Sequence, residues 1–498
     1  MTLLVPSASL GRRGEQLLER FGDHPSLLFE GRWHSSAELA GRARRAATGF
    51  KDLGVRPGDR VVVVMANCPE VGLTYTALWR AGAVPTPALF LLTEDELRHV
   101  VTDSGAVAVV TTPEFLPKVQ AASGDLPVVV VGGDGGLSWD QLEGHDELPL
   151  VDRAGDDLAA LLYTGGTTGQ SKGVALTHAS LDAAGQAAAD AAYSPGRTSL
   201  LLPLPLAHAY GLLVTVAGLH SREPGVSVLM RWFDPAGWVS LVEEHRIQAS
   251  ALVPSMIQML LAQPLEEHDL SCLERVSSGA APLAADVARE FERRVPGVEI
   301  REGYGCTESS ALISTQPNDA RRMGSVGKPV PGVEVRIDGG AAPGEDGEIC
   351  VRGPVLMQGY WNSPEGTAYA VRDGWLHTGD VGHLDQDGYL FVVDRIKDLI
   401  IRGGFNVYPR DVEDVLLAHP QVVGAAVVGR PDPKLGEEVV AFVQLASDAA
   451  VTPTALIAYA KEHLAAYKYP REVRVVEAIP LTSVLKTDRK RLRATLTG

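Results

Sequence analysis

A run of glycines, threonines and one lysine is typical of a loop that holds phosphate. Residues 163–174 read Tyr-Thr-Gly-Gly-Thr-Thr-Gly-Gln-Ser-Lys-Gly-Val. Glycine allows positive φ, so backbone N–H groups can turn toward an anion, and Lys172 adds a positive charge. The spacing differs from the P-loop, in which Gly-Lys is followed directly by Ser or Thr. A flexible surface loop is the competing interpretation of such a segment taken alone. The residues expected to contact phosphate are Thr164, Gly165, Gly166, Thr167, Thr168, Gly169 and Lys172.

Composition and charge argue against several classes of protein. The chain has 498 residues, 45% of them hydrophobic, and a formal net charge of −17, which argues against a nucleic-acid partner. Its four scattered cysteines show neither metal-ligand nor disulfide spacing, and no secretory signal pattern begins the chain, so a cytoplasmic location is expected. The apolar stretch 200–219 contains Pro203, Pro205 and His208. It is therefore expected to form a buried strand, turn and helix rather than a stable membrane insertion.

The elements that must position this loop follow an α/β pattern. Over the first three hundred or so residues, short β-branched runs alternate with alanine-rich amphipathic stretches, which predicts parallel sheets with crossover helices. From about residue 330, short strands separated by turns predict an antiparallel, barrel-like subdomain. The predicted strands are 61–65, 106–111, 126–131, 250–253, 333–337, 348–352 and 388–393, and the predicted helices are 70–81 and 256–262.

A domain boundary is expected near residues 394–398. The compact segment beyond it contains predicted helices at 409–418 and 453–466 and predicted strands at 422–428, 439–445 and near Val473. The predicted fold class is α/β. It has a large N-terminal domain, residues 1–394, made of two layered α/β subdomains and the β subdomain, and a small α+β C-terminal domain, residues 395–498.

Six segments, in order along almost the whole chain, resemble the motifs of the adenylate-forming superfamily. This superfamily includes acyl-CoA synthetases, luciferases and the adenylation domains of nonribosomal synthetases, and the resemblance points to the acyl-CoA synthetase branch. The segments are the phosphate loop; 202–211 with His208; Gly-Tyr-Gly-Cys-Thr-Glu at 303–308; Gly-Trp-Leu-His-Thr-Gly-Asp at 374–380; Asp-Arg-Ile-Lys-Asp at 394–398 with Gly403-Gly404; and Lys486. Any one of them is weak evidence, whereas six in order are hard to assemble by chance.

The resemblance implies that a carboxylate attacks the α-phosphate of ATP and that the thiol of CoA then attacks the acyl-adenylate. Two anions meet, so the chemistry depends on positive charge and positioned donors rather than on a protein nucleophile. Lys486 would bridge carboxylate and phosphate oxygens, and Thr307 would contact the α-phosphate. His208 would gate the entry of the thiol, and the small domain would swing about Lys397. Glu308 would hold Mg²⁺, which prefers hard oxygen ligands.

The resemblance also implies which residues contact the nucleotide, the acid and CoA. Asp380 and Arg395 would contact the ribose. The other remaining nucleotide contacts would be Gly279, Ala280, Ala281, Glu302, Gly303 and Tyr304. The acyl pocket would consist of His208, Ala209, Tyr210, Val253, Ser255, Gly279, Gly305, Cys306 and Ser309. Gly403 and Gly404 would present the pantetheine of CoA, and a thin tunnel beside the backbone would explain the missing side chain at Gly404.

Each of these roles has a simpler alternative. His208 could be a core histidine with its hydrogen bonds satisfied, and Asp380 could cap a turn. Glu308 could lie in the first turn of a helix. Lys397 and Lys486 could be solvated surface lysines.

Three positions depart from the family's pattern. Gly165 stands where serine is usual and removes a donor, and Ser171 stands where proline is usual and loosens the unbound loop. Leu485 replaces the glycine before the lysine, which would cost ~1 kcal/mol or more if this position needs positive φ. Because the thioester-forming segments look intact, the sequence predicts a weakened adenylation half-reaction.

The predicted pocket favours a largely apolar acid. Ala209-Tyr210-Gly211 follows His208 without the aspartate of α-amino-acid adenylation domains. The segments 253–256, 280, 306 and 309–310 around the predicted pocket offer no obvious arginine or lysine for a second carboxylate, which argues against malonate-type diacids. Small residues leave room for a fatty, aryl or polycyclic acid. ATP, Mg²⁺ and CoA are the predicted cofactors. The sequence leaves open a carrier protein as the acceptor, a homodimer, and a non-catalytic nucleotide-binding protein.

Overall fold

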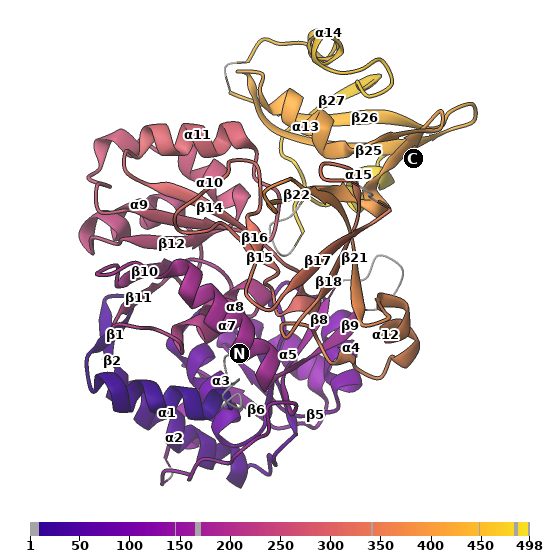
Figure 1. Ribbon diagram of the computed structural model, residues 1–498. Helices are drawn as coiled ribbons and strands as arrows, with labels where there is room; N and C mark the ends of the chain where they lie inside the picture. Colours follow the sequence, from indigo (N-terminus) through magenta and orange to yellow (C-terminus); the bar gives the residue numbers. More distant parts are fainter. Residues whose placement is uncertain are drawn as a thin grey trace.

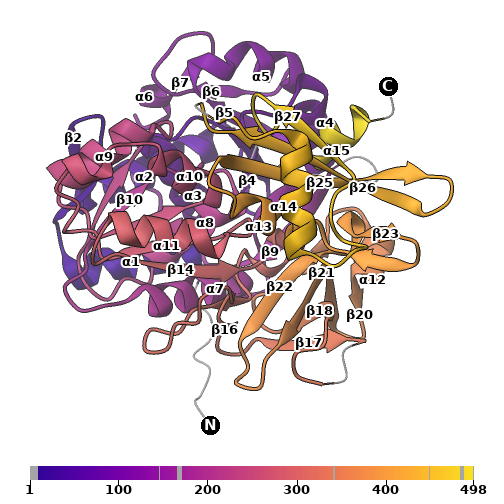
Figure 2. The ribbon, with the colours of Figure 1, turned by 90° about the horizontal axis from the view of Figure 1, so that it is seen from above.

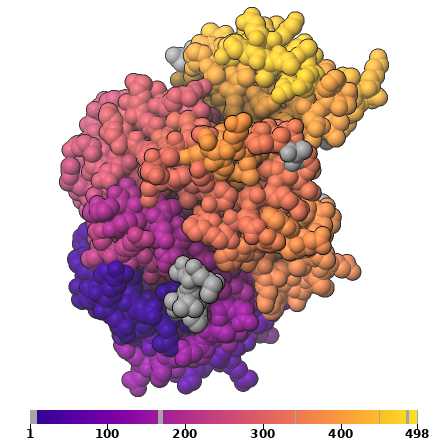
Figure 3. Space-filling view, in the orientation of Figure 1, coloured from indigo at the N-terminus to yellow at the C-terminus, as the bar shows by residue number. Residues whose placement is uncertain are grey.

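The computed structural model describes residues 9–144, 146–164, 171–339, 342–447, 449–482 and 487–496. A small C-terminal part, orange to yellow, is seated on one end of a much larger body (Figures 1 and 3). The predicted α/β class, with a large N-terminal and a small C-terminal domain, is confirmed. The boundary between residues 394 and 395 stays a prediction.

The largest sheet has nine strands in the order β16-β15-β14-β13-β12-β10-β11-β1-β2. The six consecutive strands β14, β13, β12, β10, β11 and β1 are parallel to one another, as the alternating sequence pattern predicts, whereas β15 and β2 pair with the two ends of this run in the antiparallel direction. Trp238 and Phe291 pack helices α9 and α11 onto one face, and Leu212 packs α8 toward the other. The strands are β1 (Pro25–Phe29), β2 (Arg32–Ser35), β10 (Ser199–Leu202), β11 (Val226–Leu229), β12 (Ala249–Leu252), β13 (Arg275–Ser278), β14 (Glu299–Tyr304), β15 (Ser314–Thr315) and β16 (Lys328–Pro329). The helices are α7 (His178–Ala192), α8 (Ala209–Gly218), α9 (Pro235–Glu244), α10 (Pro254–Leu261) and α11 (Ala285–Arg294).

A second sheet is parallel throughout, in the order β4-β3-β5-β6-β7. In β3, Val61 and Val63 face the core formed with α2 and α3, whereas Val62 and Val64 face the core formed with α4 and α5. A strand covered on both faces explains the unbroken run of valines. The elements are β3 (Arg60–Val64), β4 (Val84–Pro87), β5 (Ala106–Thr111), β6 (Val128–Val130), β7 (Leu137–Ser138), α1 (Leu10–Phe21), α2 (Ser36–Asp52), α3 (Pro69–Arg80), α4 (Glu94–Ser104), α5 (Leu116–Ser123) and α6 (Trp139–Leu142).

Two antiparallel sheets complete the large body. One is a three-stranded sheet, β19-β9-β8, and the other has the order β17-β18-β21-β20 with β22 paired to β21. The predicted antiparallel subdomain after residue 330 corresponds to the second. The strands are β8 (Leu158–Thr164), β9 (Lys172–Thr177), β17 (Glu334–Asp338), β18 (Gly347–Arg352), β19 (Gly359–Tyr360), β20 (Val371–Arg372), β21 (Trp375–Leu384) and β22 (Leu390–Arg395), with helix α12 (Pro364–Ala370) between β19 and β20.

The C-terminal part has a hydrophobic core of its own, centred on Val412, Val427 and Leu456. Its sheet has the order β24-β23-β26-β25, with β27 parallel to β26. Seen from above, α13 and α14 lie over the larger body (Figure 2). The predicted elements are present, although the strand predicted to end at 428 continues to Asp432 in a long hairpin with β26. The elements are β23 (Ile400–Arg402), β24 (Phe405–Val407), α13 (Pro409–Leu417), β25 (Val422–Asp432), β26 (Gly436–Leu445), α14 (Pro453–His463), β27 (Glu472–Val476) and α15 (Arg489–Ala494).

The apolar stretch 200–219 forms strand β10, a turn and helix α8, as predicted. Leu201 and Leu212 are buried in separate cores on either side of the sheet. Among the described residues, no helix combines the length and the apolar character needed to cross a bilayer.

Candidate active site

Asp380 is a buried carboxylate at the centre of a polar cluster. It lies in β21 directly opposite Arg395 of β22, whose Nε is 2.8 Å from Asp380 Oδ1. The phenol of Tyr304, at the end of β14, donates to Asp380 Oδ2 at 2.7 Å. Burial and the charge of Asp380 raise the pKa of Tyr304 well above its usual value. Only 3% of Asp380 is exposed, so its carboxylate is oriented between two side chains rather than used to cap a turn.

Glu308 lies in a second polar cluster. It belongs to the short 3-10 helix η3 (Thr307–Ser309), and its Oε1 accepts a hydrogen bond from Tyr360 at 2.8 Å. Lys172 Nζ lies 5.0 Å from the centre of the Tyr360 ring. Burial raises the pKa of the Cys306 thiol, and so do the charges of Glu308 and Asp380. The carboxylates of the two clusters therefore both lie close enough to Cys306 to raise the pKa of its thiol.

The predicted phosphate loop falls largely outside the described residues. Gly165, Gly166, Thr167, Thr168 and Gly169 belong to the undescribed segment 165–170. Thr164 and Lys172 flank it as a cross-strand pair at the open end of the β8–β9 hairpin. Lys486 and Leu485 likewise lie outside the described residues.

A cavity of about 620 Å³ begins beside these clusters. His208 is the N-cap of α8, and its Nδ1 accepts a hydrogen bond from Tyr210 N–H at 3.2 Å, so a neutral ring carries its proton on Nε2. Besides Gly303 and Thr307, several predicted residues line this end of the cavity: His208, Ala209, Tyr210, Gly279, Ala280, Gly305 and Cys306. A Cβ on Gly305 would overlap the carbonyl group of Ala311, so the backbone itself forms the wall there.

Three residues assigned to the acyl pocket are absent from the part of the cavity wall that the described residues form. Val253 packs into the core beneath α9 and α10, and Ser255 lies in the first turn of α10. Ser309 is fully buried, and its Oγ accepts from Cys306 N–H. The segments considered in the sequence carry no arginine, but Arg275 and Arg301, outside those segments, line the far end of the cavity.

Glu302 faces away from the cavity. Its neighbours in β14 on either side, Arg301 and Gly303, line the cavity, whereas the Glu302 carboxylate accepts from Leu283 N–H. Burial raises its pKa to about 7, although Arg410 and Arg321 act in the opposite direction.

Profiles of two known families match this chain. One described as AMP-binding enzyme matches residues 15–361, and one described as AMP-binding enzyme C-terminal domain matches residues 411–486. The chain belongs to the AMP-binding enzyme family. The predicted superfamily and its acyl-CoA synthetase branch are confirmed, and the chain is an AMP-forming acid–CoA ligase. ATP and CoA are substrates of this family.

Relatives of this AMP-binding enzyme span aromatic and aliphatic acids. A feruloyl-CoA synthase of an Amycolatopsis sp is 39% identical over 469 residues, covering 91% of this chain and 93% of the relative. A long-chain-fatty-acid–CoA ligase of Bacillus subtilis (strain 168) is 34% identical over 520 residues, covering 95% and 92%. The solved structure of ATP-bound MatB from Rhodopseudomonas palustris has a TM-score of 0.90 and 33% identity, covering 97% of this chain and 98% of that one.

In this AMP-binding enzyme, Lys397 lies in the 3-10 helix η4 (Ile396–Asp398) between the two domains. Burial lowers its pKa, and the positive charge of Arg395 lowers it further. Asp398 Oδ1 pairs with Arg493 of α15 at 3.0 Å. Arg410 of α13 donates to the backbone oxygen of Val392 at 2.7 Å. The Asp398–Arg493 pair lies within the C-terminal domain, whereas the Arg410 contact joins that domain to the large one in the arrangement of Figure 1.

Gly403 and Gly404 form the exposed turn between β23 and β24, with φ of 60° and 82°. No described atom lies within 4 Å of a Cβ built on Gly404, so the expected crowding is not present in this arrangement. Its positive φ is what favours glycine here. Neither glycine lines the cavity.

Proposed function

We propose that this enzyme activates a largely apolar carboxylic acid as its acyl-adenylate and transfers the acyl group to CoA. The observation that carries the proposal is the position of Thr307. This residue lines the cavity between Cys306, whose thiol is influenced by the charges of both Glu308 and Asp380, and Glu308 itself, so the cavity ends beside the two polar clusters. Relatives named for ferulic and long-chain fatty acids support an aryl or fatty substrate.

Some residues of the site would bind ATP directly, and others would orient the residues that do. Asp380, oriented by Tyr304 and Arg395, would accept hydrogen bonds from the ribose hydroxyls of ATP. Thr307 and Lys172 would donate to phosphate oxygens, and with Lys486 they would supply positive charge and donors where the acid meets the α-phosphate. No protein nucleophile is needed.

Glu308 fits a Mg²⁺ ligand because its carboxylate is a hard oxygen donor whose Oε1 is already oriented by Tyr360. When bound, Mg²⁺ supplies charge neutralisation for the phosphates. The chain contributes the orientation of this carboxylate.

Thioester formation would follow a rotation of the C-terminal domain about Lys397, which brings Gly403 and Gly404 to the cavity. The rotation requires the Arg410 contact with the backbone of Val392 to break. His208 would move aside for the thiol, and its ring could leave only by giving up the hydrogen bond from Tyr210 N–H.

A panel of aryl, fatty and polycyclic acids tests the proposal. Each acid is incubated with ATP, Mg²⁺ and CoA, and adenylate and thioester are both detected by mass. We expect thioesters from apolar acids and none from α-amino acids. Adenylate without thioester, followed by rapid transfer to a holo carrier protein, would reject CoA as the acceptor.

We also propose that the adenylation half-reaction is the weaker one, because Gly165, Ser171 and Leu485 all belong to adenylation segments. The test compares the rate of thioester formation in two reactions that both contain CoA. One starts from acid plus ATP, and the other starts from synthetic acyl-adenylate. Faster reaction from the adenylate is expected. Equal and rapid formation from both sources would refute this part.

A further inference from the structure

The cavity follows one face of the nine-stranded sheet. Because side chains alternate between the two faces of a strand, every second residue reaches the cavity wall. Strand β13 contributes Arg275 at its start, with Gly279 just beyond its end, and β14 contributes Arg301 and, just beyond its end, Gly305. Each strand therefore places an arginine at the far end of the cavity and a glycine at the nucleotide end.

The wall between the two ends carries small or apolar side chains. Leu200, Ala249 and Ala251 line it from the neighbouring strands, and Ser277 of β13 adds one hydroxyl. Arg275 and Gly279 are four residues apart in an extended segment, so the two ends lie about 13 Å apart along the direction of β13. A molecule with its carboxyl group at the nucleotide end must extend through this apolar section to contact Arg275.

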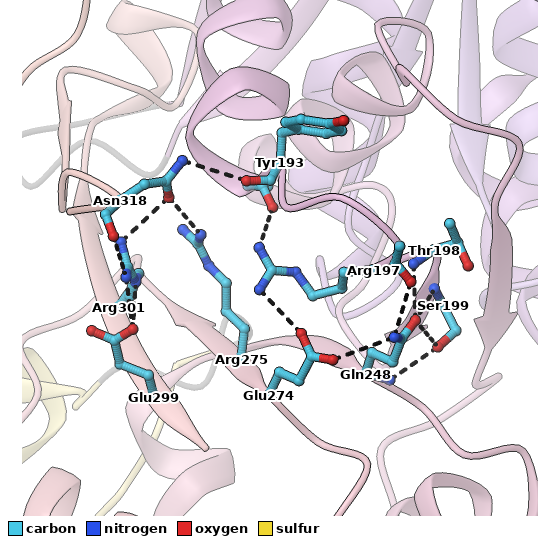
Figure 4. A network of polar contacts seen from close by, with 12 residues as sticks. Tyr193, Arg197, Thr198, Ser199, Gln248, Glu274, Arg275, Glu299, Arg301 and Asn318 are labelled. Carbon is cyan, nitrogen blue, oxygen red and sulfur yellow. Dashed lines mark hydrogen bonds and ion pairs between the residues drawn. The ribbon is translucent and has the colours of Figure 1, made fainter. Parts of the chain in front are cut away.

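The far end adjoins a second cavity of about 120 Å³ that carries three arginines and two glutamates (Figure 4). Arg301 Nη2 pairs with Glu299 at 2.7 Å. Arg197 Nη1 lies 3.6 Å from Glu274. In the described part of the chain, no carboxylate lies within ion-pair distance of Arg275, so the cluster holds one more cation than anions.

Arg275 is 5% exposed. Its Nη1 donates to Ala191 O at 2.7 Å and to Asn318 Oδ1 at 3.2 Å. Its Nε is buried and finds no acceptor among the described residues. Burial lowers the pKa of Arg275 to about 10, and the charges of Arg301 and Arg197 act in the same direction, whereas the charge of Glu299 opposes them. A buried cation without an anion is costly, and the flat fork of a guanidinium matches the geometry of an oxyanion.

We propose that Arg275 binds an oxyanion at the far end of the cavity, supplied either by the distal group of the acid substrate or by free inorganic phosphate. The first source rests on the proposed function and narrows it to acids with an apolar middle and a second anionic group. Medium-chain α,ω-dicarboxylic acids have this form. Malonate is too short to join the two ends.

Sebacic and decanoic acids test the inference because they share a chain length and differ in the distal carboxylate. Thioester formation is measured for wild type, Arg275→Gln and Arg275→Lys. For sebacic acid we expect Arg275→Gln to raise KM about tenfold to a hundredfold, with the lysine variant in between. For decanoic acid the same variant should lower KM, because it removes an unpaired buried charge. Arg289→Gln, at an exposed position of α11, is the matched control.

Melting temperatures provide a readout that needs no turnover. Wild type and Arg275→Gln are heated without ATP, in sebacate, in decanoate, or in inorganic phosphate at matched ionic strength. A stabilisation by sebacate that requires Arg275 assigns the oxyanion to the acid. A stabilisation by phosphate that requires Arg275, without any preference for sebacic acid, assigns it to the free ion.

The inference and the proposed function fail in different ways. Equal KM for sebacic and decanoic acids in all variants, with no Arg275-dependent change in melting temperature, overturns the oxyanion site and leaves the ligase activity intact. No thioester from any acid, together with Arg275-dependent stabilisation, overturns the proposed substrate assignment and supports the site.

Discussion

The phenol of Tyr360 donates a hydrogen bond to Oε1 of Glu308 at 2.8 Å. Tyr360 occupies the two-residue strand β19, which pairs with β9 opposite Val174. That pairing carries the ring beneath Lys172 Nζ. One aromatic side chain thus connects the proposed metal-binding carboxylate to the lysine at the edge of the phosphate loop.

Replacing Tyr360 by phenylalanine should weaken the use of Mg²⁺. The ring would remain, but Glu308 would lose the bond that orients its carboxylate, and such losses reduce metal affinity about tenfold or more. A Mg²⁺ titration of adenylate formation measures the change. Tyr369→Phe, at a side chain that is 82% exposed, is the control. An unchanged Mg²⁺ requirement would show that Glu308 does not hold the ion.

Asp380→Asn should raise the KM for ATP. The amide keeps the size of the carboxylate but loses its charge and one acceptor, so the Arg395 pair and the proposed ribose contact both weaken. We expect an increase of about tenfold to a hundredfold, since charged hydrogen bonds contribute about 1.5–3 kcal/mol. Asp387→Asn, at a 65% exposed position, should leave KM unchanged. A normal KM in Asp380→Asn would remove this residue from the nucleotide site.

His208 caps helix α8 and, in the proposed function, also gates the entry of the thiol. Two variants separate these two roles. His208→Ala removes the N-cap of α8 and should lower the free energy of unfolding by about 1 kcal/mol, whereas His208→Asn supplies another capping acceptor. Both should slow thioester formation from preformed adenylate. Urea unfolding and single-turnover assays measure the two effects. Wild-type transfer by His208→Asn would reduce His208 to a helix cap.

Glu302 should make stability fall as pH rises from its ordinary pKa of 4.5 to its folded value of about 7. Within this window the folded state binds more protons than the unfolded state, so the free energy of unfolding decreases and stays reduced at higher pH. Glu302→Gln removes the titration and should stabilise the protein by about 1–3 kcal/mol above pH 7. Denaturant unfolding across this range measures it, with exposed Glu19→Gln as the control. A pH-independent effect of Glu302→Gln would contradict the buried carboxylate.

The secondary structure was largely predictable because the spacing of apolar residues along the sequence reflects which faces of a helix or strand are buried. The valines of 61–64 are apolar on both faces of β3, and the strand is covered on both sides. The predicted ends differ by one to three residues where the chain leaves a helix or strand gradually, as at His463. The extension of β25 to Asp432 depends on pairing with β26, which no local pattern reveals.

The site was only partly predictable, because a sequence motif shows which residues are neighbours along the chain but not where their side chains point in the fold. Tyr304 and Asp380 were assigned to one site and do meet, but the role of Tyr360 depends on a partner 52 positions away. Val253 was assigned to the pocket and packs into the core. The arginines at the far end carried a signal, since Arg-x-Ser-x-Gly at 275–279 and Arg-x-Gly-x-Gly at 301–305 share one alternation.

The overlap between a Cβ at residue 305 and the Ala311 carbonyl also bears on engineering. The width of the cavity at that point is set by main-chain atoms, so point substitution at Gly305 would displace the 311–312 backbone before it reshaped the space for an acid. Libraries aimed at new substrates should leave Gly305 intact and randomise Ala249 and Ala251. Both alanines line the proposed path of the acid, so we expect larger side chains there to shorten the acid that the enzyme accommodates.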